Sequence, residues 1–171
     1  MSSQAIRVPK GLTTEGLLVK RYFARVIDSF LLVSVAFAAT FAATLLLPDS
    51  YGGIAGVLFI ALPAMATWLV YETLLESSRW QATLGKRFLG LKVYNSEGGR
   101  LTPRQSALRN LTKDGPFLLF GMLPGAQWLL LAWLGAHLVV LHLSPVSQAI
   151  HDRVAHTWVA APETTIELHI G

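Results

Sequence analysis

The sequence has no cysteine, which excludes disulfide bridges, thiol nucleophiles and cysteine-ligated metal sites. It also has few charged residues, 14% of its 171, against 53% that are hydrophobic. A typical soluble domain carries roughly 25% charged residues. A chain of this length fits one domain, and the shortage of charge leaves little polar sequence to cover a soluble fold.

The motifs of common enzymes are missing as well. The Gly85-Lys86 pair suggests a phosphate-binding loop, but Trp80 stands where that loop needs its first glycine and Arg87 where it needs Ser or Thr. No nucleophile is found in a pattern that pairs it with a general base. The sequence therefore predicts that the protein is not an enzyme and has no cofactor.

The five histidines do not form a metal-binding pattern. His137 and His142 lie five residues apart, and so do His151 and His156. Two histidines that bind one zinc ion from the same helix face are three or four residues apart. No metal site is expected.

The most prominent feature is a set of long uncharged stretches. Residues 29–47 and 52–71 carry no charge, and residues 115–146 form a third apolar stretch interrupted by Pro, Gly, Gln and His. About 20 apolar residues in a helix cross a hydrocarbon core of roughly 30 Å. The pattern predicts an all-α integral membrane protein, and the polar first 20 residues predict that no cleavable signal peptide is present.

The basic residues are distributed unevenly between the loops. Residues 1–28 contain five Lys and Arg, residues 72–116 contain eight, and residues 48–53 contain none. The positive-inside rule places the N-terminus and the long loop in the cytoplasm and residues 48–53 outside. We therefore expect a multi-pass protein of a bacterial-type inner (plasma) membrane, whose basic residues set its topology instead of binding nucleic acid.

The number of spans depends on how the last apolar stretch is divided. A helical bundle of four spans would use residues 27–47, 53–72, 103–122 and 126–143. Thr102-Pro103 favours this division, because Thr is a good N-cap and Pro suits the first helical position. The alternative has three spans, with a single one from 126 to 143, which would put the C-terminus outside.

Two short segments are predicted to be extended. Residues 90–94 and 100–102 flank an Asn- and Gly-containing loop and predict a cytoplasmic β-hairpin. Residues 157–161 are a further strand candidate. If that strand pairs with the hairpin, the C-terminus is cytoplasmic and the number of spans is even. We divide the chain into a cytoplasmic segment 1–20, a transmembrane domain 21–160 and a tail 161–171.

The sharpest charged pattern precedes the first apolar stretch. Arg21, Arg25 and Asp28 are spaced i, i+4 and i+7 and share one helical face. An Asp at the membrane boundary is unfavourable unless it is paired with another group or has a functional role. One interpretation is a salt bridge between Arg25 and Asp28. The other is a membrane-embedded carboxylate that binds a cation or proton, with Arg21 or Arg25 adjusting its pKa.

These residues belong to an ordered set of motifs that resembles the RDD family of membrane proteins. Arg21 would be the arginine of the family name, Asp28 its first aspartate and Asp152 its second. The resemblance covers residues 17–160, and its other motif residues are Ala24, Thr83, Gly85, Lys86, Gly90, Gln105, Arg109, His151 and Thr157. It implies a membrane protein with a suggested role in transport, since some members are linked to sodium/proton exchange.

Two functions remain open at this stage. In the first, the protein is a small ion- or proton-coupled transporter in which Asp28 binds the cation, Arg21 is its partner and Asp152 acts as a cytoplasmic gate. So small a bundle would need a second copy. In the second, it is a non-transporting scaffold or accessory subunit of a larger membrane complex, and pairs such as Arg21–Asp152 are structural.

Overall fold

The computed structural model describes residues 8–46, 54–121, 123, 125–144 and 146–163. The predicted external turn at 48–53 and most of the predicted C-terminal tail lie outside these residues. The described chain is mostly helical, with six helices and three short strands.

Four long helices occupy the regions predicted as spans. They are α1 (Leu18–Leu46), α2 (Ile54–Ser77), α4 (Pro103–Gly121) and α5 (Gln127–Leu143). Among the described residues, Leu18–Ala39 is the one helical stretch long and apolar enough to cross a bilayer, and Trp128–Leu143 is apolar but shorter. Four helices are therefore present, whereas four crossings stay a prediction.

The start of α4 agrees with the sequence pattern. Thr102 accepts a hydrogen bond on Oγ1 from the Gln105 backbone N–H (3.2 Å), and Gln105 Oε1 accepts one from the Thr102 N–H (3.0 Å). This reciprocal arrangement is a capping box, and Pro103 occupies the first helical position. A turn through Gly125, at φ +82°, then separates α4 from α5.

The sheet differs from the predicted hairpin. Strand β3 (Thr157–Pro162) lies between β1 (Leu12–Thr13) and β2 (Lys92–Asn95), and both pairings are antiparallel. The predicted second hairpin strand at 100–102 is wrong. The chain after β2 forms a tight turn, in which the Asn95 side chain accepts hydrogen bonds from the N–H groups of Glu97 and Gly99, and β2 pairs with β3.

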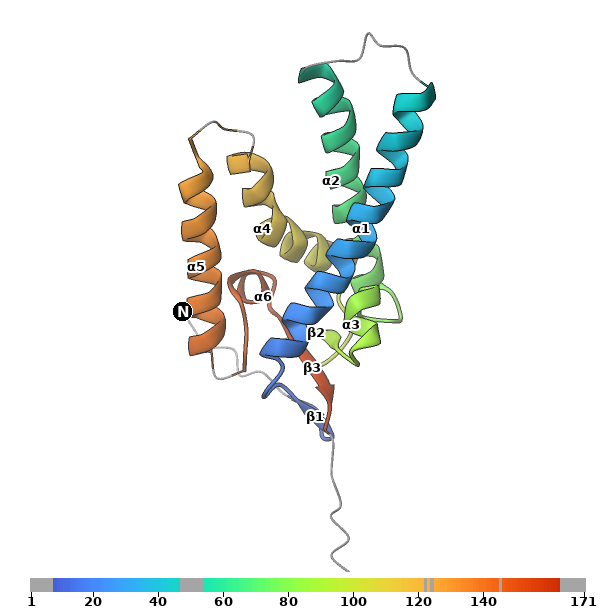
Figure 1. The fold of residues 1–171 in the computed structure, drawn as a ribbon. Helices are drawn as coiled ribbons and strands as arrows, with labels where there is room; N and C mark the ends of the chain where they lie inside the picture. Colours follow the sequence, from blue (N-terminus) through green and yellow to red (C-terminus); the bar gives the residue numbers. More distant parts are fainter. Residues whose placement is uncertain (1–7, 47–53, 122, 124, 145, 164–171) are drawn as a thin grey trace, which may run out of the picture.

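The strand predicted at residues 157–161 is confirmed, and its residues 157–160 pair with β2. It brings three distant parts of the chain to one end of the molecule (Figure 1). Two short helices, α3 (Leu84–Phe88) and α6 (Ile150–Val154), lie near the same end. The buried apolar core is also here, with Leu17, Leu91, Val93, Leu101, Val159 and Ala161 packed together.

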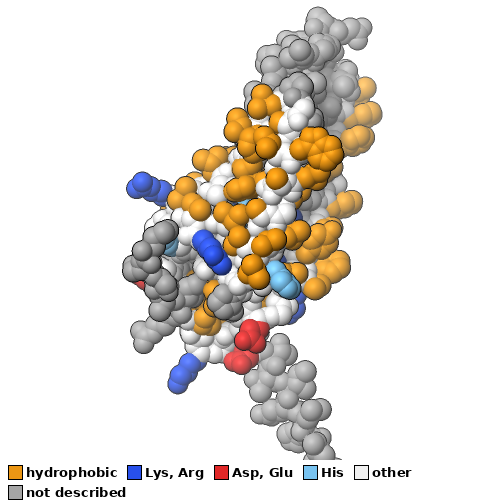
Figure 2. Space-filling view, turned by 90° about the vertical axis from the view of Figure 1, so that its left-hand side faces the viewer, with side chains coloured by type: hydrophobic (Ala, Val, Ile, Leu, Met, Phe, Trp, Pro, Cys, Tyr) orange, Lys and Arg blue, Asp and Glu red, His pale blue; other side chains and the backbone are white. Residues whose placement is uncertain are grey.

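The long helices are polar inside and apolar outside. Glu72 and Glu76 of α2 are buried, while Leu74 between them is 61% exposed. On α4, Arg109 and Asn110 are buried and their neighbour Leu111 is 54% exposed. Figure 2 shows hydrophobic side chains covering much of one face, with the acidic side chains in view toward its lower part. Soluble helices have the opposite pattern, so this arrangement supports a hydrocarbon environment around these helices.

Candidate functional site: a buried ion-pair network

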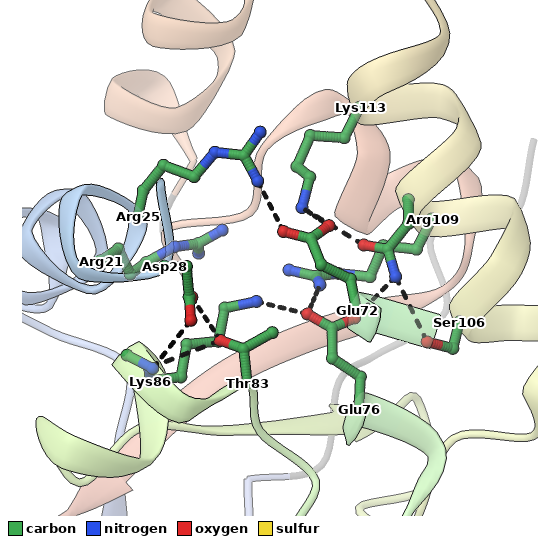
Figure 3. Close-up of polar contacts among 12 residues, drawn as sticks. Arg21, Arg25, Asp28, Glu72, Glu76, Thr83, Lys86, Ser106, Arg109 and Lys113 are labelled. Atoms are coloured by element: carbon green, nitrogen blue, oxygen red, sulfur yellow. Dashed lines mark hydrogen bonds and ion pairs between the residues drawn. The ribbon is translucent and has the colours of Figure 1, made fainter. Parts of the chain in front are cut away.

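The interior of the molecule contains a network of charged side chains from five helices (Figure 3). Helices α1, α2, α3, α4 and α6 each contribute at least one of them. The basic members are Arg21, Arg25, Lys86, Arg109 and Lys113, and the acidic members are Glu72, Glu76, Asp114 and Asp152.

Asp152 connects the two ends of the chain. Its Oδ2 accepts a hydrogen bond from Arg21 of α1 at 2.5 Å, and its Oδ1 accepts one from Arg109 Nε of α4 at 2.8 Å. Oδ2 also accepts from the Ala149 N–H at 3.1 Å, which caps α6. Burial alone would raise the pKa of Asp152, but the neighbouring guanidinium groups of Arg21 and Arg109 hold it well below its usual value. Asp152 is therefore ionised throughout the physiological range.

Glu76 accepts hydrogen bonds from two cations. Its Oε1 bonds Arg109 Nη1 at 2.5 Å and also the Lys86 ammonium of α3. Its Oε2 faces the Asn110 amide nitrogen at 3.4 Å. The side chains of Arg109 and Glu76 are 1% and 0% exposed. Burial lowers the pKa of Lys86, although Glu76 counteracts this effect.

Glu72 lies one helical turn before Glu76 in α2 and has two cationic partners of its own. Oε1 accepts from Arg25 at 2.5 Å, and Oε2 accepts from Lys113. Arg25 also donates to Asp114 Oδ1 at 2.6 Å, and its guanidinium lies over the Trp68 ring, 4.5 Å from the centroid. Helix α2 is thus joined to α4 at two successive levels, and in addition to α1 through Glu72 and to α3 through Glu76.

Asp28 is held differently from the other carboxylates. Its Oδ1 accepts from the Tyr71 hydroxyl and from the Gly85 N–H, both at 2.8 Å, and its Oδ2 accepts from Thr83 Oγ1 at 2.6 Å. The residue is 2% exposed. Within the described part of the chain, no basic side chain forms an ion pair with it. Three neutral donors replace the hydration of this buried carboxylate.

The close approach of α3 to α1 explains why residue 85 is glycine. A Cβ built there would lie 2.2 Å from the carbonyl oxygen of Ala24 and 3.0 Å from Asp28 Oδ2. No side chain fits in that space. The Thr83 hydroxyl also accepts from the Lys86 N–H, so the same residue caps α3 and binds Asp28.

Comparison with known families matches this constellation. The family model of the RDD family covers residues 16–156. The chain belongs to the RDD family. No curated protein and no solved structure matched it.

The RDD motif residues fall into two groups in the structure. Arg21 and Arg109 meet on Asp152, and Arg109 and Lys86 meet on Glu76. Asp28 lies apart from these ion pairs, on its three neutral donors. The expectation that Arg21 or Arg25 pairs with Asp28 is wrong, because both arginines are engaged by other carboxylates. Their partners come from α2, α4 and α6, which local spacing on α1 does not reveal.

The remaining RDD motif residues support the backbone around this network. Gly90 adopts φ +71° in the turn before β2, and Gln105 caps α4. Thr157 Oγ1 lies 3.4 Å from the carbonyl oxygen of Asp152. His151 stacks on His137, and their Nδ1 and Nε2 atoms are 2.8 Å apart. His137 and His151 are 14 residues apart in the sequence, and the fold brings their rings together.

Sequence reasoning missed four members of the network as functional candidates. They are Glu72, Glu76, Lys113 and Asp114. A signal was present: Glu72/Glu76 and Arg109/Lys113 are both i, i+4 pairs, one acidic and one basic, at the ends of predicted spans. Two such pairs on neighbouring helices predict a ladder of ion pairs.

Proposed function

We propose that this RDD protein is a non-transporting membrane scaffold or accessory subunit, in which the ion-pair network fixes a cytoplasmic sheet to the membrane helices. The observation that carries the proposal is the state of Asp28. A carboxylate that binds and releases a cation needs a free oxygen and a path to solvent. Asp28 has three protein donors and is 2% exposed, so it offers neither.

The charge balance supports the same conclusion. With Asp28 included, the buried cluster contains five carboxylates and five cations, so it is electrically neutral without a bound ion. The acidic members are Asp28, Glu72, Glu76, Asp114 and Asp152, and the basic members are Arg21, Arg25, Lys86, Arg109 and Lys113. Neutral networks in which almost every charged group is hydrogen-bonded favour a single conformation. A scaffold needs that property, whereas alternating access needs two conformations.

Removal of a partner from such a network is expected to be costly. Breaking a buried ion pair by deleting one member costs about 3–5 kcal/mol, because the other charge stays buried and uncompensated. In this model the charged residues determine how much folded protein is present. As a scaffold the protein would act beside a second copy or within a larger complex in the bilayer, and we propose no catalytic role for it.

Proton- or cation-coupled transport is the second candidate, and one observation favours it. Asp114 Oδ2 is buried without a hydrogen-bond donor among the described residues, 3.5 Å from the Lys113 ammonium. Asp114 also shares Arg25 with Glu72, so two carboxylates lie on one cation. If the protein moves protons, this pair is better placed than Asp28 to carry them.

Flux in proteoliposomes tests the two functions against each other. Wild type, Asp28→Asn and Asp114→Asn would be reconstituted at equal density and given pH, sodium and potassium gradients. The scaffold proposal expects no flux above empty liposomes from any of the three, and a lower melting temperature for Asp28→Asn. Wild-type flux that disappears in a stably folded Asp114→Asn variant would refute it and establish the transporter.

The scaffold also predicts stable assembly in native membranes. Gentle solubilisation followed by native electrophoresis should place the protein well above its 18.7 kDa chain mass plus bound detergent. The same chain purified in a denaturing detergent provides the migration of the monomer for comparison. Migration of the native protein as that monomer would contradict an assembly role.

A further inference from the structure

Helix α3 contributes Lys86 and Gly85 to the network, but its outer face takes no part in it. Leu84 and Phe88 are one turn apart on that face and are 41% and 82% exposed. With Ile27 of α1 and Arg87 they line a groove of about 430 Å³ between the two helices. The groove is open along one side, and its lining is mostly apolar with one charged side chain.

The groove lies at the membrane boundary. The Gly85 N–H donates to Asp28, so α3 lies beside the last charged residue before the uncharged stretch 29–47. Figure 1 shows α3 packed beside the lower part of α1, at the end of the molecule that carries the sheet. On α1, Phe30 and Leu31 lie one turn beyond Ile27 in the uncharged stretch, are apolar, and are 76% and 36% exposed. The apolar lining of the groove is therefore continuous in depth with a lipid-facing helix.

The charged group of the groove is oriented and unneutralised. The Arg87 guanidinium lies over the Trp80 ring, 4.2 Å from its centroid. Stacking of this kind orients the guanidinium while its N–H groups stay free to bind an anion. No carboxylate in the described ranges forms an ion pair with Arg87. Residues 79–92 contain four basic residues and no acidic one, and Lys86 alone of them is turned inward to Glu76.

We propose that the α1–α3 groove binds an anionic phospholipid, with an acyl chain against Ile27, Leu84 and Phe88 and the phosphate on Arg87. Arginine binds phosphate through two parallel N–H donors, and tryptophan is enriched at the level of the headgroups. An apolar partner without charge would leave Arg87 unpaired, and a soluble anion would leave Phe88 in water. A phospholipid satisfies both parts of the groove at once.

Native mass spectrometry of the purified full chain tests the proposal. Wild type would be incubated with equimolar phosphatidylglycerol and phosphatidylcholine of the same acyl chains, and separately with glycerol phosphate, which has the headgroup charge without the chains. We expect at least a fivefold preference for bound phosphatidylglycerol and no retention of glycerol phosphate. Equal retention of the two lipids, or retention of glycerol phosphate, would overturn the proposal.

Three variants locate the site. Arg87→Gln should reduce the preference to less than twofold, whereas Arg104→Gln, which removes an exposed arginine at the start of α4, should leave it unchanged. Phe88→Ala keeps the charge and should lower the retention of phosphatidylglycerol severalfold. Each variant would be compared only after circular dichroism and elution volume match those of wild type. A preference that survives both Arg87→Gln and Phe88→Ala would place lipid binding elsewhere.

Discussion

Substitution of Gly85 by alanine tests the packing of α3 on α1 directly. The added Cβ would lie 2.2 Å from the Ala24 carbonyl oxygen, whereas ordinary van der Waals contact begins at 3.4 Å. The helices must therefore separate locally by about 1.2 Å, the difference between these distances. That movement pulls the Gly85 N–H away from Asp28, to which it donates at 2.8 Å.

Three effects determine how much the substitution changes the free energy of unfolding. Overpacking a tight interface costs about 1–3 kcal/mol, and loss of a hydrogen bond to a charged group costs about 1.5–3 kcal/mol. The better helix propensity of alanine returns about 1 kcal/mol. The free energy of unfolding should therefore fall by about 3 kcal/mol, which corresponds to roughly 6–12 °C in melting temperature for a chain of this size.

Thermal unfolding in detergent, followed by tryptophan fluorescence, measures the change. Gly135→Ala is the matched control, because a Cβ at Gly135 in α5 would meet nothing within 4 Å. That control should melt at or slightly above the wild-type temperature. If Gly85→Ala melts within about 2 °C of Gly135→Ala, the close contact between α3 and α1 does not exist as described here.

Two further predictions concern the network. Arg109→Met leaves Glu76 and Asp152 buried without their shared cation, so the free energy of unfolding should fall by about 3–5 kcal/mol. The control Arg104→Met, on the surface of α4, should change it by less than about 0.5 kcal/mol. Equal melting temperatures for the two variants would contradict the buried position of Arg109. Burial lowers the pKa of His151 well below its ordinary value of 6.5, against the attraction of Asp152. As the pH falls, the unfolded chain therefore binds a proton at this histidine before the folded chain does, so the free energy of unfolding should decrease below about pH 6.5. His151→Gln should flatten this decrease between pH 7 and 5 in melting experiments, and an unchanged slope would show that other groups cause it.

The helices and their ends could be predicted because their causes are local. Uncharged stretches of about 20 residues determine long helices, and the Thr102-Pro103 pair determines where α4 begins. The strand at residues 157–161 was also visible in the sequence. The hairpin prediction failed because residues 100–102 form no strand, and the partner of β2 along four residues is β3, which is distant in the sequence.

Membrane association, the helices, the family and the identity of the charged residues could be inferred from the sequence alone. These follow from composition, from periodicity and from short motifs that act over a few residues. The tertiary structure decided which charges meet. Arg25 and Asp114 are 89 residues apart in sequence and 2.6 Å apart in space, and Asp28 is held by donors 43 to 57 residues away. The charge of a side chain follows from its chemistry, whereas its partner depends on how the helices pack. That packing decides whether a buried carboxylate is free to bind an ion or already has hydrogen-bond donors.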